Sequence, residues 1–100
     1  MRIIALSTLR IFWESHSAYS DTKAPLVELY RPMQKANYPT PQALKAELRA
    51  ASILKSGRVV FNVGGNKYRV MMAIDYQRQL GFIRFVGTHA QYDQINAESV

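Results

Sequence analysis

The sequence predicts an α+β domain in which an N-terminal strand and two to three helices come first, antiparallel strands follow, and a short helix ends the chain. Two patterns favour this class. Apolar residues recur at helical spacing in the first half of the chain, and runs rich in β-branched and aromatic residues separated by glycine turns fill the second half. The length of 100 residues and the hydrophobic fraction of 48% predict one domain, residues 1–100, with a modest core.

The charge balance favours a polyanionic partner. Lys and Arg total 13 and Asp and Glu total 7, which gives a formal charge of +6 and a pI of about 9.9. Nucleic acid, an acidic protein and an anionic membrane surface all match this balance. No apolar run approaches the roughly 20 residues that a membrane helix needs. The first residues lack a basic region followed by a long apolar core, so secretion is not expected. With no cysteine to form disulfides, a cytoplasmic location is expected.

Residues 1–6, MRIIAL, are short and β-branched enough to form a buried strand. Ser7 is expected to cap a helix that ends near Ser17, with Leu6 and Ile11 forming a hydrophobic staple. The residues that follow at helical spacing are Leu9, Phe12, Trp13 and His16. A single histidine on an amphipathic helix is more often a surface residue than a catalytic one, so His16 is not assigned to a site.

A second helix is expected to begin around residues 20–22, because Ser, Asp and Thr cap well and Pro25 is tolerated in the first turn. Its core stripe consists of Leu26, Leu29, Tyr30 and Met33. Pro32 would cost about 3 kcal/mol in an unbroken helix. This helix is therefore predicted to end or kink near Arg31.

Thr40 and Pro41 form a good cap and first-position pair for a third helix, which is predicted to run to about Ala51. Leu44 and Leu48 are expected to face the core. The charged residues of this helix, which are expected to face solvent, are Lys45, Glu47 and Arg49. Ser56 and Gly57 then break the chain before the strands begin.

Residues 58–63 and 67–74 predict a hairpin with a tight two-residue loop within Gly64, Gly65 and Asn66. Either choice of loop gives the same parity of pairing. The inward face then receives Val59, Phe61, Tyr68, Val70 and Met72, and the opposite face receives Arg58, Asn62, Lys67 and Arg69. A second short turn around Tyr76 and Gln77 would place Arg84 near Arg69, with Ile83 and Phe85 inward.

The predicted sheet therefore has one apolar face and one basic face. Like charges opposite one another destabilise a sheet, so the basic cluster favours an anion-binding site. The cluster consists of Arg58, Lys67, Arg69 and Arg84. Phe82, on the same expected face, would lie beside a base or ribose. The alternative is a solvated face that carries charges against edge aggregation.

The last strand is followed by GTHAQYD, in which Thr88 is expected to cap a short helix. This helix would place His89 and Tyr92 on one side, at the end of the basic strands. Histidine titrates near neutrality and serves as a general acid or base, and a phenol donates, accepts or stacks. The pair is a candidate for catalysis beside the cationic residues.

Two segments carry a family resemblance: FNVGGNKYRV at 61–70 and FIRFVGTHAQYD at 82–93. Together with TLRIFWESH and TPQALKAEL, they resemble the HigB family of toxins, a branch of the RelE-like messenger RNA endonucleases. The resemblance implies helices packed on one face of a twisted antiparallel sheet. It also implies a ribosome-associated toxin that cleaves translated mRNA. Such a toxin is held inactive by a HigA-type helix-turn-helix antitoxin. It is expected to contact operator DNA only indirectly, through that antitoxin. Pro32 departs from the commoner pattern.

This chemistry assigns roles to the candidate residues. Lys67, Arg69 and Arg84 are expected to clamp the phosphate during attack by the 2′-OH, with His89 transferring a proton and Tyr92 orienting a base or assisting. Lys67 as the base remains an alternative. The wider RNA footprint is expected to include Lys45, Arg49, Lys55, Arg58, Asn66 and Phe82. No cluster has metal-ligand spacing, Asp75 and Asp93 are assigned to a turn and a helix, and no cofactor is predicted.

Overall fold

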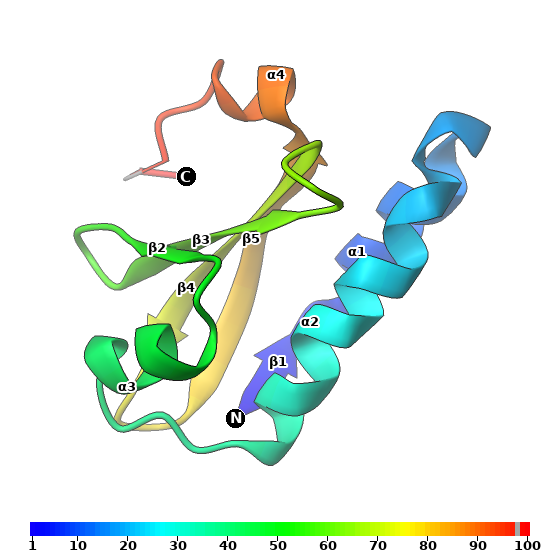
Figure 1. Ribbon diagram of the computed structural model, residues 1–100. Coiled ribbons are helices and arrows are strands. Elements are labelled where there is room, and N and C mark those ends of the chain that lie inside the picture. Colours follow the sequence, from blue (N-terminus) through cyan, green and yellow to red (C-terminus); the bar gives the residue numbers. More distant parts are fainter. Residues whose placement is uncertain (98) are drawn as a thin grey trace.

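The computed structural model describes residues 1–97 and 99–100, and these form an α+β fold around one five-stranded sheet (Figure 1). The strands lie in the order β1-β5-β4-β3-β2. Strands β2 to β5 pair antiparallel, and β1 adds to β5 in parallel, so the sheet is mixed. The strands are β1 (Arg2–Ile4), β2 (Ala51–Ile53), β3 (Arg58–Val63), β4 (Tyr68–Asp75) and β5 (Leu80–Thr88). The helices are α1 (Leu6–Ser15), the 3₁₀ helix η1 (Ser17–Thr22), α2 (Lys23–Lys35), α3 (Pro41–Glu47) and α4 (His89–Tyr92).

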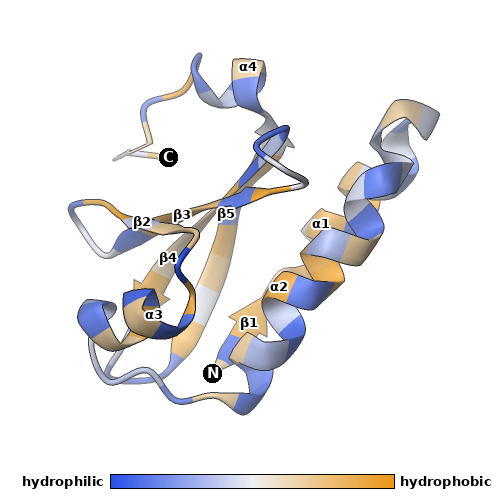
Figure 2. Cartoon of the chain, viewed as in Figure 1, coloured by the Kyte–Doolittle hydropathy of each residue, from blue (hydrophilic) through white to orange (hydrophobic). Residues whose placement is uncertain are grey.

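The main core lies between one face of the sheet and the helices α1, α2 and α3. Its fully buried residues include Leu9, Leu26, Met33, Leu44, Val59, Phe61, Val70 and Met72. Figure 2 shows the apolar colour along the strands, whereas apolar and polar residues alternate along α2. The expected inward positions of both helices and strands are confirmed at these residues.

Helix α1 begins without the expected serine cap. Its N-cap is Ala5, in the left-handed region at φ 70°, and no side chain accepts a hydrogen bond there. Ser7 lies inside the helix, so the predicted cap is wrong. The predicted staple is also wrong, because Ile11 is 62% exposed and points away from the core. His16 follows the helix, and its Nδ1 accepts the Ala18 N–H at 3.0 Å.

Helix α2 begins at Lys23, directly after η1, and continues to Lys35. It does not end near Arg31, because Pro32 lies inside it. Pro32 and Glu28 are both exposed. The Glu28 carbonyl that the missing N–H leaves free therefore remains open to water, which reduces the cost of proline at this position.

Helix α3 begins as predicted, since the Thr40 hydroxyl accepts the Ala43 N–H at 3.1 Å and Pro41 is the first residue. It ends at Glu47, earlier than expected, and Ala51–Ile53 forms the edge strand β2. The Ala51 N–H donates to the Leu48 carbonyl in the turn between them. Ala51, which local propensity assigned to the end of the helix, therefore belongs to a strand because it pairs with β3.

The β3–β4 loop contains four residues, Gly64 to Lys67, and not two, because Val63 pairs with Tyr68. Gly64, Gly65 and Asn66 all have positive φ, at 61°, 61° and 80°. Three consecutive left-handed residues make the longer loop possible, and glycine adopts this conformation without a steric penalty. The parity of the pairing is unchanged, so the predicted faces of β3 and β4 are confirmed. Lys67 lies in the loop and not on the strand.

The pairing of β4 with β5 contains an irregularity that moves one side chain to the other face. Met72 pairs with Ile83, whereas Met71 pairs with Phe85, so Arg84 is the extra residue of a β-bulge. Ile83 is buried in the main core as predicted. Phe85, predicted to point inward, shares the opposite face with Met71. The turn before β5 also has four residues, 76–79, where a shorter one was expected.

The face opposite the helices is not a bare basic surface. Val60 and Met71 pair on this face and are both buried. The segment after α4 returns over this side of the sheet (Figure 1), and the Arg58 Nε donates to the Val100 carbonyl oxygen at 3.0 Å. A second, smaller apolar layer therefore separates some of the predicted basic residues from one another.

Candidate functional site

The β3–β4 loop and the start of α4 meet at one end of the sheet. The His89 N–H donates to the Lys67 carbonyl at 3.0 Å, which joins the two segments directly. Thr88 begins α4 through a capping box: its hydroxyl accepts the Gln91 N–H at 3.1 Å, and its own N–H donates to Gln91 Oε1 at 2.9 Å. Local sequence and tertiary pairing together thus set the position of His89.

The His89 side chain of α4 is exposed, the Tyr92 side chain is half-buried, and both have defined neighbours. His89 Nε2 lies 3.5 Å from Asp93 Oδ2, one turn along the chain. The Tyr92 ring lies 6.1 Å from the Phe85 ring, centroid to centroid. The bulge that turned Phe85 to this face therefore gives Tyr92 a packing partner, and Asp93 supplies a carboxylate that can orient a protonated His89.

Lys67 forms an ion pair across the molecule. Its Nζ lies 2.9 Å from Asp21 Oδ2, and Asp21 Oδ1 accepts the Tyr68 hydroxyl at 2.8 Å. The hydrogen bond and charge of Asp21 raise the Lys67 pKa above its ordinary value. The Asp21 pKa is lowered, first by the hydrogen bond from Lys67 and then by the one from Tyr68. Lys67 is therefore held in its charged form.

Arg69 is 9% exposed, although it belongs to the predicted basic face. Its Nη1 donates to the carbonyl oxygens of Asn66 at 2.9 Å and Tyr68 at 3.1 Å. Arg69 pairs with Gly87 on β5, so it lies beside the segment that leads to His89. None of the ion pairs found among the described residues involves Arg69. A cation held by carbonyl groups and without a carboxylate partner retains its attraction for an anion.

Arg84 lies on the bulge and is exposed. Its guanidinium carbon is 5.8 Å from the centroid of the Phe82 ring, so the two side chains share a face. This arrangement presents a planar cation and an aromatic ring together, five residues before His89. A cation beside an aromatic ring has the chemistry to contact phosphate and base.

Except for Asn66, the remaining candidates lie away from this end of the sheet. Arg58 is four residues from Asn62 along β3, about 13 Å, and donates to the carbonyls of Ser56 and Val100. Lys45 Nζ donates to the carbonyls of Arg49 and Ala51, so it caps the end of α3. Arg49 and Lys55 are exposed. Asn66 is at the loop, where its side chain accepts from Asn62 at 3.0 Å.

The structure therefore joins the backbone of Lys67 to that of His89, and it pairs Arg69 with Gly87, two residues before His89. Tyr92 follows on α4, and Arg84 and Phe82 lie further along β5. It does not gather all four basic strand residues, because Arg58 lies at the other end of β3 and Lys67 is in the loop. Asp21 is not predicted as a site residue from the sequence. Nothing local marks Asp21, since it is 46 residues from Lys67 along the chain. Asp93 was assigned only to a helix, although its spacing of four residues from His89 was a usable signal.

The described residues contain no group of three or more His, Cys, Asp and Glu side chains arranged to hold a metal ion. In the same part of the chain, no helix has both the length and the apolar composition that crossing a membrane requires.

Comparison with known proteins identifies the family. A family model, HigB_toxin, described as the RelE-like toxic component of a toxin-antitoxin system, matches residues 22–95. The mRNA interferase toxin HigB of Escherichia coli K12 is 33% identical over 94 residues, which are 92% of this chain and 90% of that protein. The mRNA interferase HigB of Shigella flexneri gives the same values. The mRNA interferase HigB of Escherichia coli CFT073 is 27% identical over 86 residues, 84% of each chain. This chain therefore belongs to the HigB family of RelE-like toxins of toxin-antitoxin systems.

Proposed function

We propose that this protein is an endoribonuclease that cleaves translated mRNA at the ribosome without a metal ion and is neutralised by a HigA-type antitoxin. The observation that carries the proposal is the junction of the β3–β4 loop with α4, where His89 N–H meets the Lys67 carbonyl beside the buried Arg69. The names of the similar proteins, mRNA interferases, support the same activity. The proposed setting is the cytoplasm, with operator DNA contacted only through the antitoxin.

In the proposed reaction the 2′-oxygen of one nucleotide attacks its own 3′-phosphorus, forming a new P–O bond while the bond to the 5′-oxygen breaks. The products are a 2′,3′-cyclic phosphate and a free 5′-hydroxyl. One proton must leave the 2′-OH and one must reach the 5′-oxygen. His89 is suited to proton transfer, and the cationic groups of Lys67, Arg69 and Arg84 are suited to stabilising the charge that develops on the phosphoryl oxygens.

Tyr92 and Phe82 are proposed to hold the bases. Each carries an aromatic ring next to a proposed catalytic group: Tyr92 follows His89 by three residues, and Phe82 stacks with Arg84. Stacking tolerates any base, and it would hold mRNA with little sequence preference. The footprint proposed for Lys45, Arg49, Lys55, Arg58 and Asn66 would add salt-sensitive phosphate contacts.

Growth arrest tests the site. Expression of the parent protein should stop growth, and His89→Ala and Arg84→Ala should each relieve the arrest while the protein stays folded and still binds its antitoxin. His16→Ala and Arg31→Ala are matched controls, because both residues are exposed and lie outside the proposed site. Both control variants should remain toxic. If His89→Ala and Arg84→Ala are as toxic as the parent, the site assignment is wrong.

Primer extension on translated mRNA tests the activity. New 5′ ends should appear with the parent protein and ribosomes, and they should persist in EDTA at ribosome-preserving polyamine concentrations. Toxicity without new ends would identify a non-catalytic RNA- or ribosome-binding module. A protein that binds a small helix-turn-helix partner but neither arrests growth nor cuts RNA would be a degenerate toxin retained as an antitoxin partner.

A further inference from the structure

We propose that Asp21 is a positioning residue for Lys67, which it holds as a cation beside His89, so that Lys67 stabilises phosphate charge and does not act as a general base. The inference deepens the proposed function and rests on it. It concerns a residue of η1, outside the sheet and outside the segments that make up the site.

The geometry gives Asp21 two different partners. Oδ1 accepts the hydroxyl of Tyr68 at 2.8 Å, and Oδ2 pairs with Lys67 Nζ at 2.9 Å. Tyr68 is buried, whereas the side chains of Asp21 and Lys67 are 51% and 63% exposed. Isolated exposed pairs are weakly held because both side chains are mobile. Here the Asp21 carboxylate is already held by a hydrogen bond from the buried Tyr68 hydroxyl, so forming the ion pair must order only the Lys67 side chain.

Aromatic packing fixes the element that carries Asp21. The Tyr19 ring of η1 stacks on Phe12 of α1 with centroids 4.6 Å apart, and it meets the Tyr68 ring edge-on at 6.3 Å. The Phe12 ring also meets the Tyr68 ring edge-on at 5.9 Å. Each such ring pair is worth about 0.5–1.5 kcal/mol beyond burial. The 3₁₀ helix η1 is thereby held against the start of β4, next to the β3–β4 loop.

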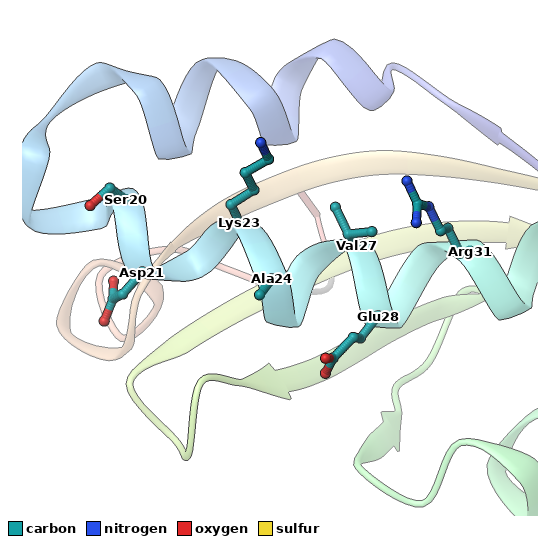
Figure 3. A pocket seen from close by; sticks show the side chains of 7 residues that line it. All are labelled: Ser20, Asp21, Lys23, Ala24, Val27, Glu28 and Arg31. Atoms are coloured by element: carbon teal, nitrogen blue, oxygen red, sulfur yellow. The ribbon is translucent and has the colours of Figure 1, made fainter.

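Asp21 lies at the end of an open cavity of about 620 Å³ along α2. Figure 3 shows Asp21 and Glu28 pointing to one side of the helix, whereas Lys23 and Arg31 point to the other. Asp21 alone of these two carboxylates forms one of the ion pairs found in the described part of the chain. Glu28 is therefore a natural comparison: an exposed acid on the same side of the same helix layer, without the bond to the loop.

Lys67 is consequently held at two points. Its side chain is held by Asp21, and its carbonyl accepts the His89 N–H at 3.0 Å. The ammonium group is thus restrained at Asp21, and the backbone of the same residue is restrained at His89, before RNA binds. Such preorganisation of a charged group is what stabilises a charged transition state. The carboxylate also raises the Lys67 pKa. A lysine held charged in this way is a poor proton acceptor at neutral pH and a good partner for phosphate.

Kinetics of the ribosome-dependent cleavage test the role of Asp21. Asp21→Asn keeps the shape and removes the charge, and it should lower kcat roughly fivefold with little change in KM. Asp21→Glu should recover part of the loss. The control Glu28→Gln removes one negative charge nearby and should leave kcat unchanged. If Asp21→Asn is as active as the parent, the proposal is wrong. It is also wrong if Asp21→Asn and Glu28→Gln raise activity equally, because both would then act by reducing the repulsion of RNA.

Substitutions at Lys67 test whether Asp21 acts through it. Lys67→Met should lower kcat, and Lys67→Arg should retain most of the activity, because guanidinium keeps the charge but cannot serve as a base. In the Lys67→Met background, Asp21→Asn should have no further effect. An inactive Lys67→Arg variant would identify Lys67 as the base. If Asp21→Asn still lowers kcat to the same extent in the Lys67→Met background, Asp21 acts through some other residue. Either outcome overturns the proposal.

A readout without RNA separates this inference from the proposed function. Nuclear magnetic resonance of the Lys67 ammonium group should show a lower pKa in Asp21→Asn, and the His89 amide should exchange faster with solvent. A parent protein that cuts no RNA while these signals respond would overturn the proposed function but leave the hold of Asp21 on Lys67 established. Unchanged signals with an active parent would overturn the inference alone.

Discussion

The helix-covered core and the loop end of the sheet differ in what holds their residues in place. On the side of α1, α2 and α3, Phe61, Val70 and Met72 are fully buried among apolar neighbours. At the loop end, Lys67 and His89 are exposed and held by hydrogen bonds and ion pairs. Burial supplies most of the folding free energy, whereas exposed polar contacts supply little. Substitutions in the core should therefore mainly lower stability, and substitutions at the loop end should mainly lower activity.

Arg69 and Gly87 do not fit this division, because they are buried although they lie beside the loop end. They pair with each other across β4 and β5, directly before His89, and both are buried. Their pairing fixes the backbone position of the segment that leads to His89.

Phe61→Ala should have the largest effect on stability. The side chain is fully buried between the sheet and the helices, and removing a buried phenylalanine costs about 3–5 kcal/mol because it leaves a cavity. Urea unfolding of the purified protein measures this loss. The control Ile53→Ala, on the exposed edge strand β2, should change the free energy of unfolding by about 0.5 kcal/mol or less. Equal losses for the two variants would contradict the proposed division.

Arg69→Met should lower cleavage about a hundredfold, since it removes a buried cation of the proposed site. Methionine keeps most of the side-chain volume, so the free energy of unfolding should fall by only about 1–2 kcal/mol, the cost of leaving the Asn66 and Tyr68 carbonyls unbonded. Single-turnover cleavage and urea unfolding measure the two effects. A variant that is destabilised but fully active would make Arg69 a structural residue.

Gly87→Ala should disturb the start of α4. A Cβ at this position would lie 2.5 Å from Gln91 Oε1 and 2.7 Å from Phe85 Cζ. Such overpacking costs about 1–3 kcal/mol. The displaced Gln91 side chain also loses its capping bond to the Thr88 N–H. We expect lower stability, measured by urea unfolding, and faster exchange of the His89 amide. An unchanged amide would show that α4 keeps its position without the capping box.

The smallest expected effect is the pH dependence of the Asp21 ion pair. Folding lowers the Asp21 pKa below its ordinary 3.8, so the pair stabilises the protein above that value. This contribution should be lost as pH falls through the lowered pKa, where the carboxylate takes up a proton. Urea unfolding of the parent and Asp21→Asn should therefore differ by a constant amount between pH 5 and 7, and the difference should shrink below about pH 3.8. A constant difference down to pH 2 would contradict this assignment.

Several features of this protein follow from the sequence by itself. The Thr40 and Thr88 caps, the cores of β3 and β4 and their two faces were all predictable, because each depends on residues a few positions apart. The family was also recognisable from short segments such as FNVGGNKYRV and FIRFVGTHAQYD. Local chemistry and periodicity determine such features wherever the chain repeats one pattern over a strand or a helical turn.

Only the tertiary structure decided the remaining features. Strand β2 forms because β3 offers a partner, the bulge at Arg84 turns Phe85 to the opposite face, and Arg69 becomes buried beneath the loop. Asp21 reaches Lys67 across 46 residues because aromatic packing brings η1 to β4. Each depends on which distant elements pack together. The physical reason is that pairing register and burial are properties of the assembled sheet and core, whereas propensity and spacing act along the chain.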